Sequence, residues 1–151
     1  MLIENPLTSS ELAFPIVECF HIVGFAFSVG TAAIVDFRLL GIGMADRSPS
    51  ELWEDTWRWT LGGLILMVFS GLLLFSSDPD NYYLNYAFLL KMFFLTLAIV
   101  WNYTAVRKTT AATPSGKSKL VGSVSLVLWA LVAFGGIFIG FISSTLNIHR
   151  I

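Results

Sequence analysis

The chain has 151 residues, of which 56% are hydrophobic and only 13% charged, and its mean hydropathy is +0.76. A soluble domain of this size needs more polar surface, so the composition excludes that class and predicts an integral membrane protein. The net charge of -1 gives no basis for binding nucleic acid. The single cysteine, Cys19, excludes an internal disulfide and any site built from several thiolates of one chain.

We predict an all-α integral membrane protein, a single transmembrane domain over residues 1–151 that forms a four-helix bundle. Its helices are expected at about 11–40, 57–77, 84–106 and 120–144. Each apolar run reaches the roughly 20 residues that a helix needs to cross a bilayer. The N-terminal residues lack the basic segment of a signal peptide, so we expect the first span to be retained.

The first predicted helix carries ionisable side chains inside its apolar run. Glu18, His21 and Asp36 fall within an arc of roughly 80° on an ideal helix, which turns about 100° per residue. Titratable groups in hydrocarbon are costly and usually face the interior of a bundle or a water-filled cavity. We therefore expect this stripe to face the other helices, with Asp36 and Arg38 as interfacial charges at its end.

The segment before the second span has the pattern of a short amphipathic helix. Ser48-Pro-Ser-Glu51 resembles a helix N-terminus, and Trp53 and Trp57 follow it. Indole rings beside a span are typical of a membrane interface. We expect these two tryptophans to lie there, ahead of the span that starts at about residue 57.

The third and fourth spans contribute one cation and a group of glycines. Lys91 lies well inside the third apolar run, and the fourth holds Gly135, Gly136 and Gly140. Small residues at this spacing are typical of helix–helix contacts in membranes, so we consider a homo-oligomer as well as contacts within the chain. The second histidine, His149, lies in the tail and is expected to be solvated.

Basic residues gather in and beside the first and third loops. Lys and Arg favour the cytoplasmic side, which predicts an inner-membrane protein of a bacterial cell with both termini outside (N-out, C-out). Seven basic residues lie on that side, against Arg150 alone on the other: Arg38, Arg47, Arg58, Arg107, Lys108, Lys117 and Lys119.

With this orientation, polar groups and glycines from all four helices share one depth. At about 1.5 Å per residue, four of them fall within about one turn of each other, roughly a dozen ångströms below the outer surface. They are His21, Met67, Lys91 and Gly136, and Glu18 lies one turn nearer to that surface. We predict that these five residues form a cofactor or ion site.

A purely structural reading explains the same residues without a ligand. Lys91 and Glu18 would form an ion pair that fastens the first helix to the third. Met67 would pack in the core, and the glycines would serve close helix contact.

Several functions fit this set of residues. His21 can be an axial ligand of haem b for electron transfer, with Met67, Lys91 or a second copy of His21 opposite. Copper or another metal ion, transported or otherwise handled, is an alternative with His21, Glu18 and Met67 as ligands. A proton or ion relay that ends at Asp36 is a third. The protein can also be a non-catalytic accessory subunit of a larger membrane complex.

The chain also resembles a known group of membrane proteins. His21 and Gly24 in the first helix, Ser70-Gly71 in the second and the segment from Tyr86 to Lys91 in the third carry the likeness. This pattern is similar to the four-helix membrane domain of the bacterial copper-resistance protein D (CopD) group and its small uncharacterised relatives. It is also similar to the HemJ-type protoporphyrinogen oxidases. The resemblance implies that His21 and Lys91 are the matching positions and that bound haem is worth testing.

Overall fold

The computed structural model describes residues 10–83, 85–112 and 115–148, and the side chains of these residues except Asn81 and 140–148. It is all-α, as predicted. Four of its helical stretches are long and apolar enough to cross a membrane: Ala13–Leu40, Pro49–Ser77, Tyr86–Thr110 and Gly116–Ile139. The chain is therefore a multi-pass membrane protein with four candidate spans.

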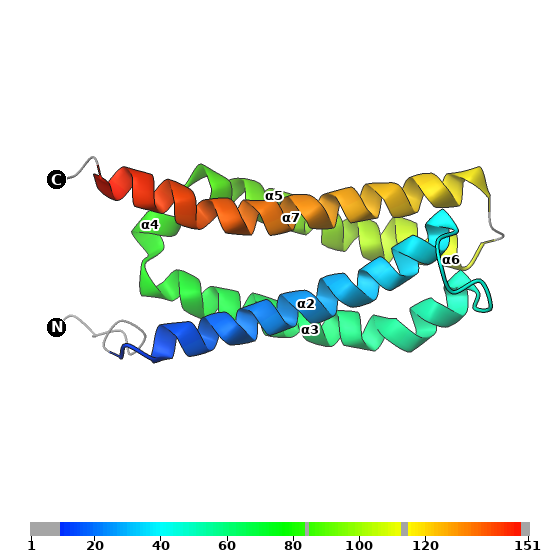
Figure 1. The fold of residues 1–151 in the computed structure, drawn as a ribbon, viewed down its shortest axis with the longest axis horizontal. Helices are drawn as coiled ribbons and strands as arrows, with labels where there is room; N and C mark the ends of the chain where they lie inside the picture. Colours follow the sequence, from blue (N-terminus) through cyan, green and yellow to red (C-terminus); the bar gives the residue numbers. More distant parts are fainter. Residues whose placement is uncertain (1–9, 84, 113–114, 149–151) are drawn as a thin grey trace.

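The helices form two antiparallel pairs, α2 with α3 and α5 with α7 (Figure 1). We call the end where both termini and α4 lie the terminal end, and the end with the α2–α3 and α6–α7 connections the basic end. The elements in chain order are α2 (Ala13–Leu40), α3 (Pro49–Ser77), α4 (Pro79–Tyr83), α5 (Tyr86–Trp101), the π-helix η1 (Asn102–Val106), α6 (Arg107–Thr110) and α7 (Gly116–Ile148).

The segment expected to be a separate interfacial helix is instead the first part of α3. The Ser48 side chain accepts a hydrogen bond from the Glu51 N–H, the Glu51 carboxylate accepts one from the Ser48 N–H, and Pro49 starts the helix. Nothing interrupts the helix between this cap and residue 57. Trp53 is buried and packs edge-on against Tyr103, with ring centroids 5.9 Å apart, so it faces the bundle interior.

The other helix ends agree only in part with the expected ones. Helix α2 ends as predicted at Leu40, because Gly41 adopts the left-handed conformation (φ 82°) and its N–H bonds back to the Arg38 carbonyl. The third span begins at Tyr86, where the Asn85 side chain caps the helix by accepting a hydrogen bond from the Ala87 N–H; the expected start, Leu84, lies outside the described residues. The span then passes through η1 and ends at Thr110. Helix α7 extends four residues beyond the predicted 120–144 at each end.

The pairs are held by glycines at which backbones meet. A Cβ added at Gly63 would lie 2.8 Å from the Gly24 carbonyl oxygen and 2.8 Å from the Ser28 nitrogen. A Cβ at Gly135 would lie 3.0 Å from the Lys91 Cβ, which marks the contact between α5 and α7. These contacts are those of small residues at the crossing points of membrane helices.

Two buried apolar clusters fill the bundle. The first lies around the middle of the helices and the second towards the basic end. The middle cluster contains Ala32, Leu64, Met67, Leu95, Ala98, Trp129 and Val132. The basic-end cluster contains Val35, Leu39, Leu52, Trp53 and Val106.

The α2–α3 contact predicts that alanine substitutions at two adjacent glycines, Gly62 and Gly63, differ in their effect on stability. Gly63→Ala should lower the free energy of unfolding by about 1–3 kcal/mol, because the new methyl group meets backbone atoms that cannot move aside. Gly62→Ala meets nothing within 4 Å and should leave stability unchanged or slightly higher. Denaturant unfolding in detergent micelles measures both, and equal effects would contradict the packing described.

Candidate functional site

The imidazole of His21 is held against the backbone of α3. Its Nδ1 lies 2.8 Å from the Met67 carbonyl oxygen and 3.2 Å from the Ser70 Oγ. A carbonyl oxygen can only accept, so Nδ1 carries the hydrogen and donates it to Met67. In the neutral ring the lone pair is then on Nε2, and no hydrogen bond to Nε2 is formed by the residues that the structure describes.

Gly71 gives the ring its place on α3. A Cβ at this position would lie 3.0 Å from the His21 Cε1 and 3.4 Å from Nδ1. The Ser70 hydroxyl, on the same turn, donates to the Leu66 carbonyl at 2.6 Å and so presents a lone pair to the Nδ1–H. The sequence Ser70-Gly71 thus provides one hydrogen-bond partner and an open surface for the imidazole.

Lys91 approaches the same region from the other helix pair. Its backbone contacts α7 at Gly135, and its Nζ would lie 3.5 Å from a Cβ at Gly136. The Lys91 side chain therefore extends along α7, and its ammonium group lies beside Gly136. It is near enough to His21 for a direct electrostatic interaction between the two side chains. The structure places Lys91 beside Gly136 and within electrostatic range of His21, while α5 packs mainly against α7 rather than against α2.

Met67 contributes its backbone but not its sulfur. The side chain is 1% exposed and belongs to the middle apolar cluster. Only its carbonyl oxygen contacts His21. This arrangement corresponds to the structural reading of Met67, in which the thioether packs in the core.

Glu18 lies apart from this group. Its side chain is exposed, and it interacts electrostatically with Tyr82, whose pKa is raised first by burial and then by the carboxylates of Glu18 and Asp78. The ion pairs between described residues are both made by Arg47, with Glu51 and Asp55, so the predicted Glu18–Lys91 ion pair is absent there.

No metal-binding cluster accompanies the imidazole. Within 10–83, 85–112 and 115–148, no three His, Cys, Asp or Glu side chains lie close enough to hold a metal ion together. The second histidine, His149, lies outside the described residues. The copper alternative thus keeps one of its three predicted ligands, His21, in a suitable position.

Asp36 faces the bundle interior, as its place on the α2 stripe predicted, but it is not the interfacial charge that was expected. Its side chain is 0% exposed. The reason is a close contact with α7, where a Cβ at Gly122 would lie 2.8 Å from the Asp36 carbonyl oxygen. Arg38, two residues on, does lie at the basic end and donates from Nε to the Arg47 carbonyl oxygen at 2.6 Å.

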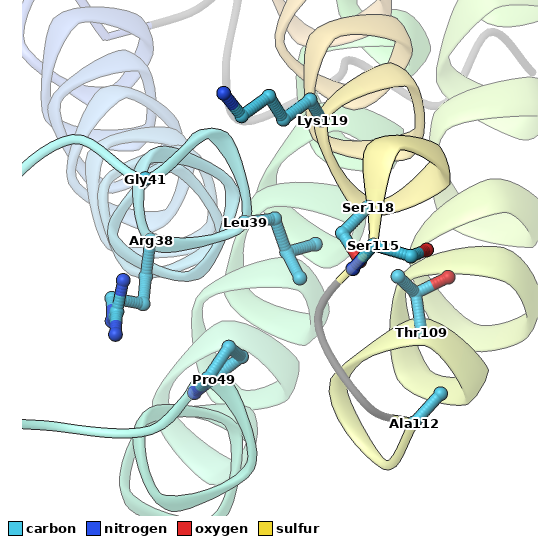
Figure 2. A pocket seen from close by; sticks show the side chains of 9 residues that line it. All are labelled: Arg38, Leu39, Gly41, Pro49, Thr109, Ala112, Ser115, Ser118 and Lys119. Carbon is cyan, nitrogen blue, oxygen red and sulfur yellow. The ribbon is translucent and has the colours of Figure 1, made fainter.

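Two hollows are better defined than the rest of the surface, and neither is lined by His21 or Lys91. One, of about 150 Å³, opens at the basic end between α2, α3, α6 and α7 (Figure 2). The other is a shallow depression beside Phe27 and Gly30 of α2.

The position of Glu18 can be tested through the phenol beside it. Glu18→Gln removes a negative charge near Tyr82 and should lower the pKa of that tyrosine, because the phenolate is then less disfavoured. The titration can be followed by NMR of ring-labelled tyrosine, with Tyr82→Phe to assign the signal and Glu11→Gln as the control. An unchanged Tyr82 pKa in Glu18→Gln would mean that the carboxylate points elsewhere.

One known family accounts for most of the chain. The family described as "Family of unknown function (DUF6644)" matches residues 11–142, which include every residue of the site. Searches of the curated proteins and of the solved structures find no match. The protein belongs to the DUF6644 family.

Proposed function

We propose that this protein binds a b-type haem with the His21 Nε2 as an axial ligand, and that it transfers electrons in a bacterial inner membrane. The observation that carries the proposal is the hydrogen bond from the His21 Nδ1–H to the Met67 carbonyl oxygen, 2.8 Å long. Histidines that ligate metals usually donate their second ring N–H to a carbonyl or carboxylate, which fixes the tautomer and the ring orientation.

The residue that accepts this hydrogen bond, Met67, supports a role of His21 as a haem ligand. Met67 lies in the middle of α3, a long helix in backbone contact with α2. The acceptor is thus rigid, and the ring is pre-oriented by two elements at once.

Lys91 and the glycines supply what the anionic edge of a haem requires. The Lys91 ammonium would pair with a propionate carboxylate, an ion pair that is strong where water is scarce. Gly71 and Gly136 leave flat surfaces beside the imidazole and the ammonium. When bound, the haem would supply one-electron redox chemistry, while the chain would orient its ligand and balance its charge.

The direction of the chain in the membrane is part of the proposal. Six basic residues lie at the basic end, which supports a cytoplasmic position for that end and places His21 near the outer surface. They are Arg38, Arg47, Arg107, Lys108, Lys117 and Lys119. Both termini would then be outside the cell membrane.

The resemblance to the CopD and HemJ groups supports the same positions. Of the residues that carry it, Ser70 and Gly71 contact the imidazole, and Lys91 interacts with it. Copper handling and an accessory role in a larger complex are alternatives that the experiments below separate, and a homo-oligomer is compatible with each of them.

The absorption spectrum of the purified protein tests haem binding. The wild type should show a Soret band, as isolated or after addition of haem, and His21→Ala should abolish it. Gly71→Ala should lower haem occupancy severalfold, because its methyl group would lie 3.0 Å from the ring carbon Cε1 and displace the ligand. Gly62→Ala, on the exposed side of α3, is the matched control and should bind as the wild type does.

Three results would count against the proposal. The first is a wild-type protein that stays colourless after haem is added, and the second is an unchanged Soret band in a folded His21→Ala variant. The third is stoichiometric copper by elemental analysis, lost in His21→Ala, which would favour the metal alternative. Co-purification with a larger membrane complex that survives His21→Ala would favour the accessory role.

A further inference from the structure

Asp36 is a buried carboxyl group without a counter-charge. Its side chain is 0% exposed, and neither carboxylate oxygen has a hydrogen-bond partner among the described residues. The other four aspartates, Asp46, Asp55, Asp78 and Asp80, are exposed. An unpaired carboxylate inside a protein is costly, so the group needs a proton, a cation or water.

The nearest polar side chain does not meet this need. The Ser125 hydroxyl of α7 is close enough to Asp36 to interact with it, yet the two groups do not form a hydrogen bond of standard geometry. Ser125 is 1% exposed, and its Oγ has no partner among the described side chains and backbone groups either. Each of the two groups therefore still needs a well-placed hydrogen-bond partner.

A third element reaches the same level of the bundle. The Trp101 indole donates to the Val121 carbonyl oxygen at 3.2 Å, next to the point where Gly122 meets Asp36. The two following residues, Asn102 and Tyr103, begin the π-helix η1. Their side-chain oxygens, Oδ1 and the phenol oxygen, are buried and also lack partners among the described residues. Single π-turns within α-helices are frequent at functional sites.

These unpartnered groups are complementary in kind. The Asp36 carboxylate and the Asn102 amide oxygen accept hydrogen bonds, whereas Ser125, Tyr103 and the buried Trp129 Nε1–H donate them. Buried donors and acceptors that lack protein partners are the groups that internal water usually satisfies. A metal ion would use the oxygens but leave the Trp129 N–H unsatisfied.

The hollow at the basic end extends between α2 and α7 towards Asp36. Leu39, one turn from Asp36, and Ser118, one turn from Gly122, both line it (Figure 2). Arg38 and Lys119 lie at its edge. These two cations repel a metal ion at the entrance, whereas neutral water can pass them.

Other titratable groups around Asp36 are engaged elsewhere or are uncharged. On α2, Arg38 donates to Arg47, and on η1, Tyr103 is a neutral phenol. The charged residues at the start of α3 are exposed: Glu51, Glu54, Asp55 and Arg58. On α7, Lys119 is exposed at the hollow, and on α6, Arg107 and Lys108 are exposed.

We propose that Asp36 is a proton-binding site, which exchanges its proton with the solution at the basic end through water in the adjoining hollow. The carboxylate takes one proton from a water molecule that is re-protonated from the bulk, and it returns the proton by the same route. This site is separate from His21 and does not depend on haem.

Infrared spectroscopy of the protein in lipid nanodiscs tests the site. Labelling aspartate with ¹³C at the carboxyl carbon should shift a protonated-carboxyl band that disappears reversibly as the pH is raised. Asp36→Asn should remove this band, while Asp46→Asn, at an exposed aspartate, should keep it. The labelled wild type alone answers the question if Asp36→Asn does not fold.

The route is tested by isotope exchange. Thr109→Leu fills the hollow and should slow the shift of the Asp36 band after transfer to D₂O severalfold, whereas Thr104→Leu, at an exposed threonine of η1, should not. No labelled protonated-carboxyl band at any pH would overturn the proposal. A carboxylate band that responds to sodium ions rather than to acid would do so in favour of a cation site, and an unchanged exchange rate in Thr109→Leu would overturn the route.

Discussion

The bundle depends on the contact between the backbones of α2 and α3, where neither Gly24 nor Gly63 has a side chain. A Cβ at Gly24 would lie 2.6 Å from the Met67 nitrogen, so any larger residue would push α3 away. This contact lies one turn from His21. It brings the Met67 carbonyl within hydrogen-bond distance of the imidazole, and the candidate site therefore follows from the packing of two glycines.

A second close backbone contact at a glycine lies towards the basic end of the bundle. Gly122 lets α7 approach the backbone of Asp36, which closes α2 and α7 over a carboxyl group that would otherwise reach the interface. The two proposed sites thus lie at opposite ends of α2, separated by the middle apolar cluster. A redox centre towards one surface and a proton site towards the other would give the chain the two parts needed to couple electron and proton movement.

Much of the fold was predictable from hydropathy and length. Four long apolar runs gave four spans, and the conformational preference of Gly41 gave the end of α2. Helical periodicity also placed Asp36 and Ser28 on the face of α2 that is buried. The join between the amphipathic segment and α3 was missed because a polar stretch with a good cap can continue a helix as well as precede one. The π-helix at Asn102 has no recognisable sequence signal.

The site was predictable only in part, because a stripe on one helix does not say how the helices cross. His21, Lys91 and Gly136 were expected at one depth; in the structure Lys91 lies beside Gly136 and within electrostatic range of His21. Glu18 was assigned to the same stripe, but one turn is enough to carry it away from Lys91 and to Tyr82. The depth predicted for Met67 placed it beside His21, but the predicted sulfur ligand was not the atom involved. The backbone carbonyl oxygen of Met67 makes the hydrogen bond to the imidazole, and the side chain belongs to the middle apolar cluster.

The most direct test of this account is the protonation pattern of the His21 ring, read from ¹⁵N NMR of the haem-free protein. Labelled histidine gives two ring systems in this chain, and His149→Gln reduces them to one. We expect a protonated Nδ1 and an unprotonated Nε2, whose signal is lost or shifted when haem is added. A ring with its hydrogen on Nε2, or an Nε2 signal that haem leaves unchanged, would contradict the proposed ligand.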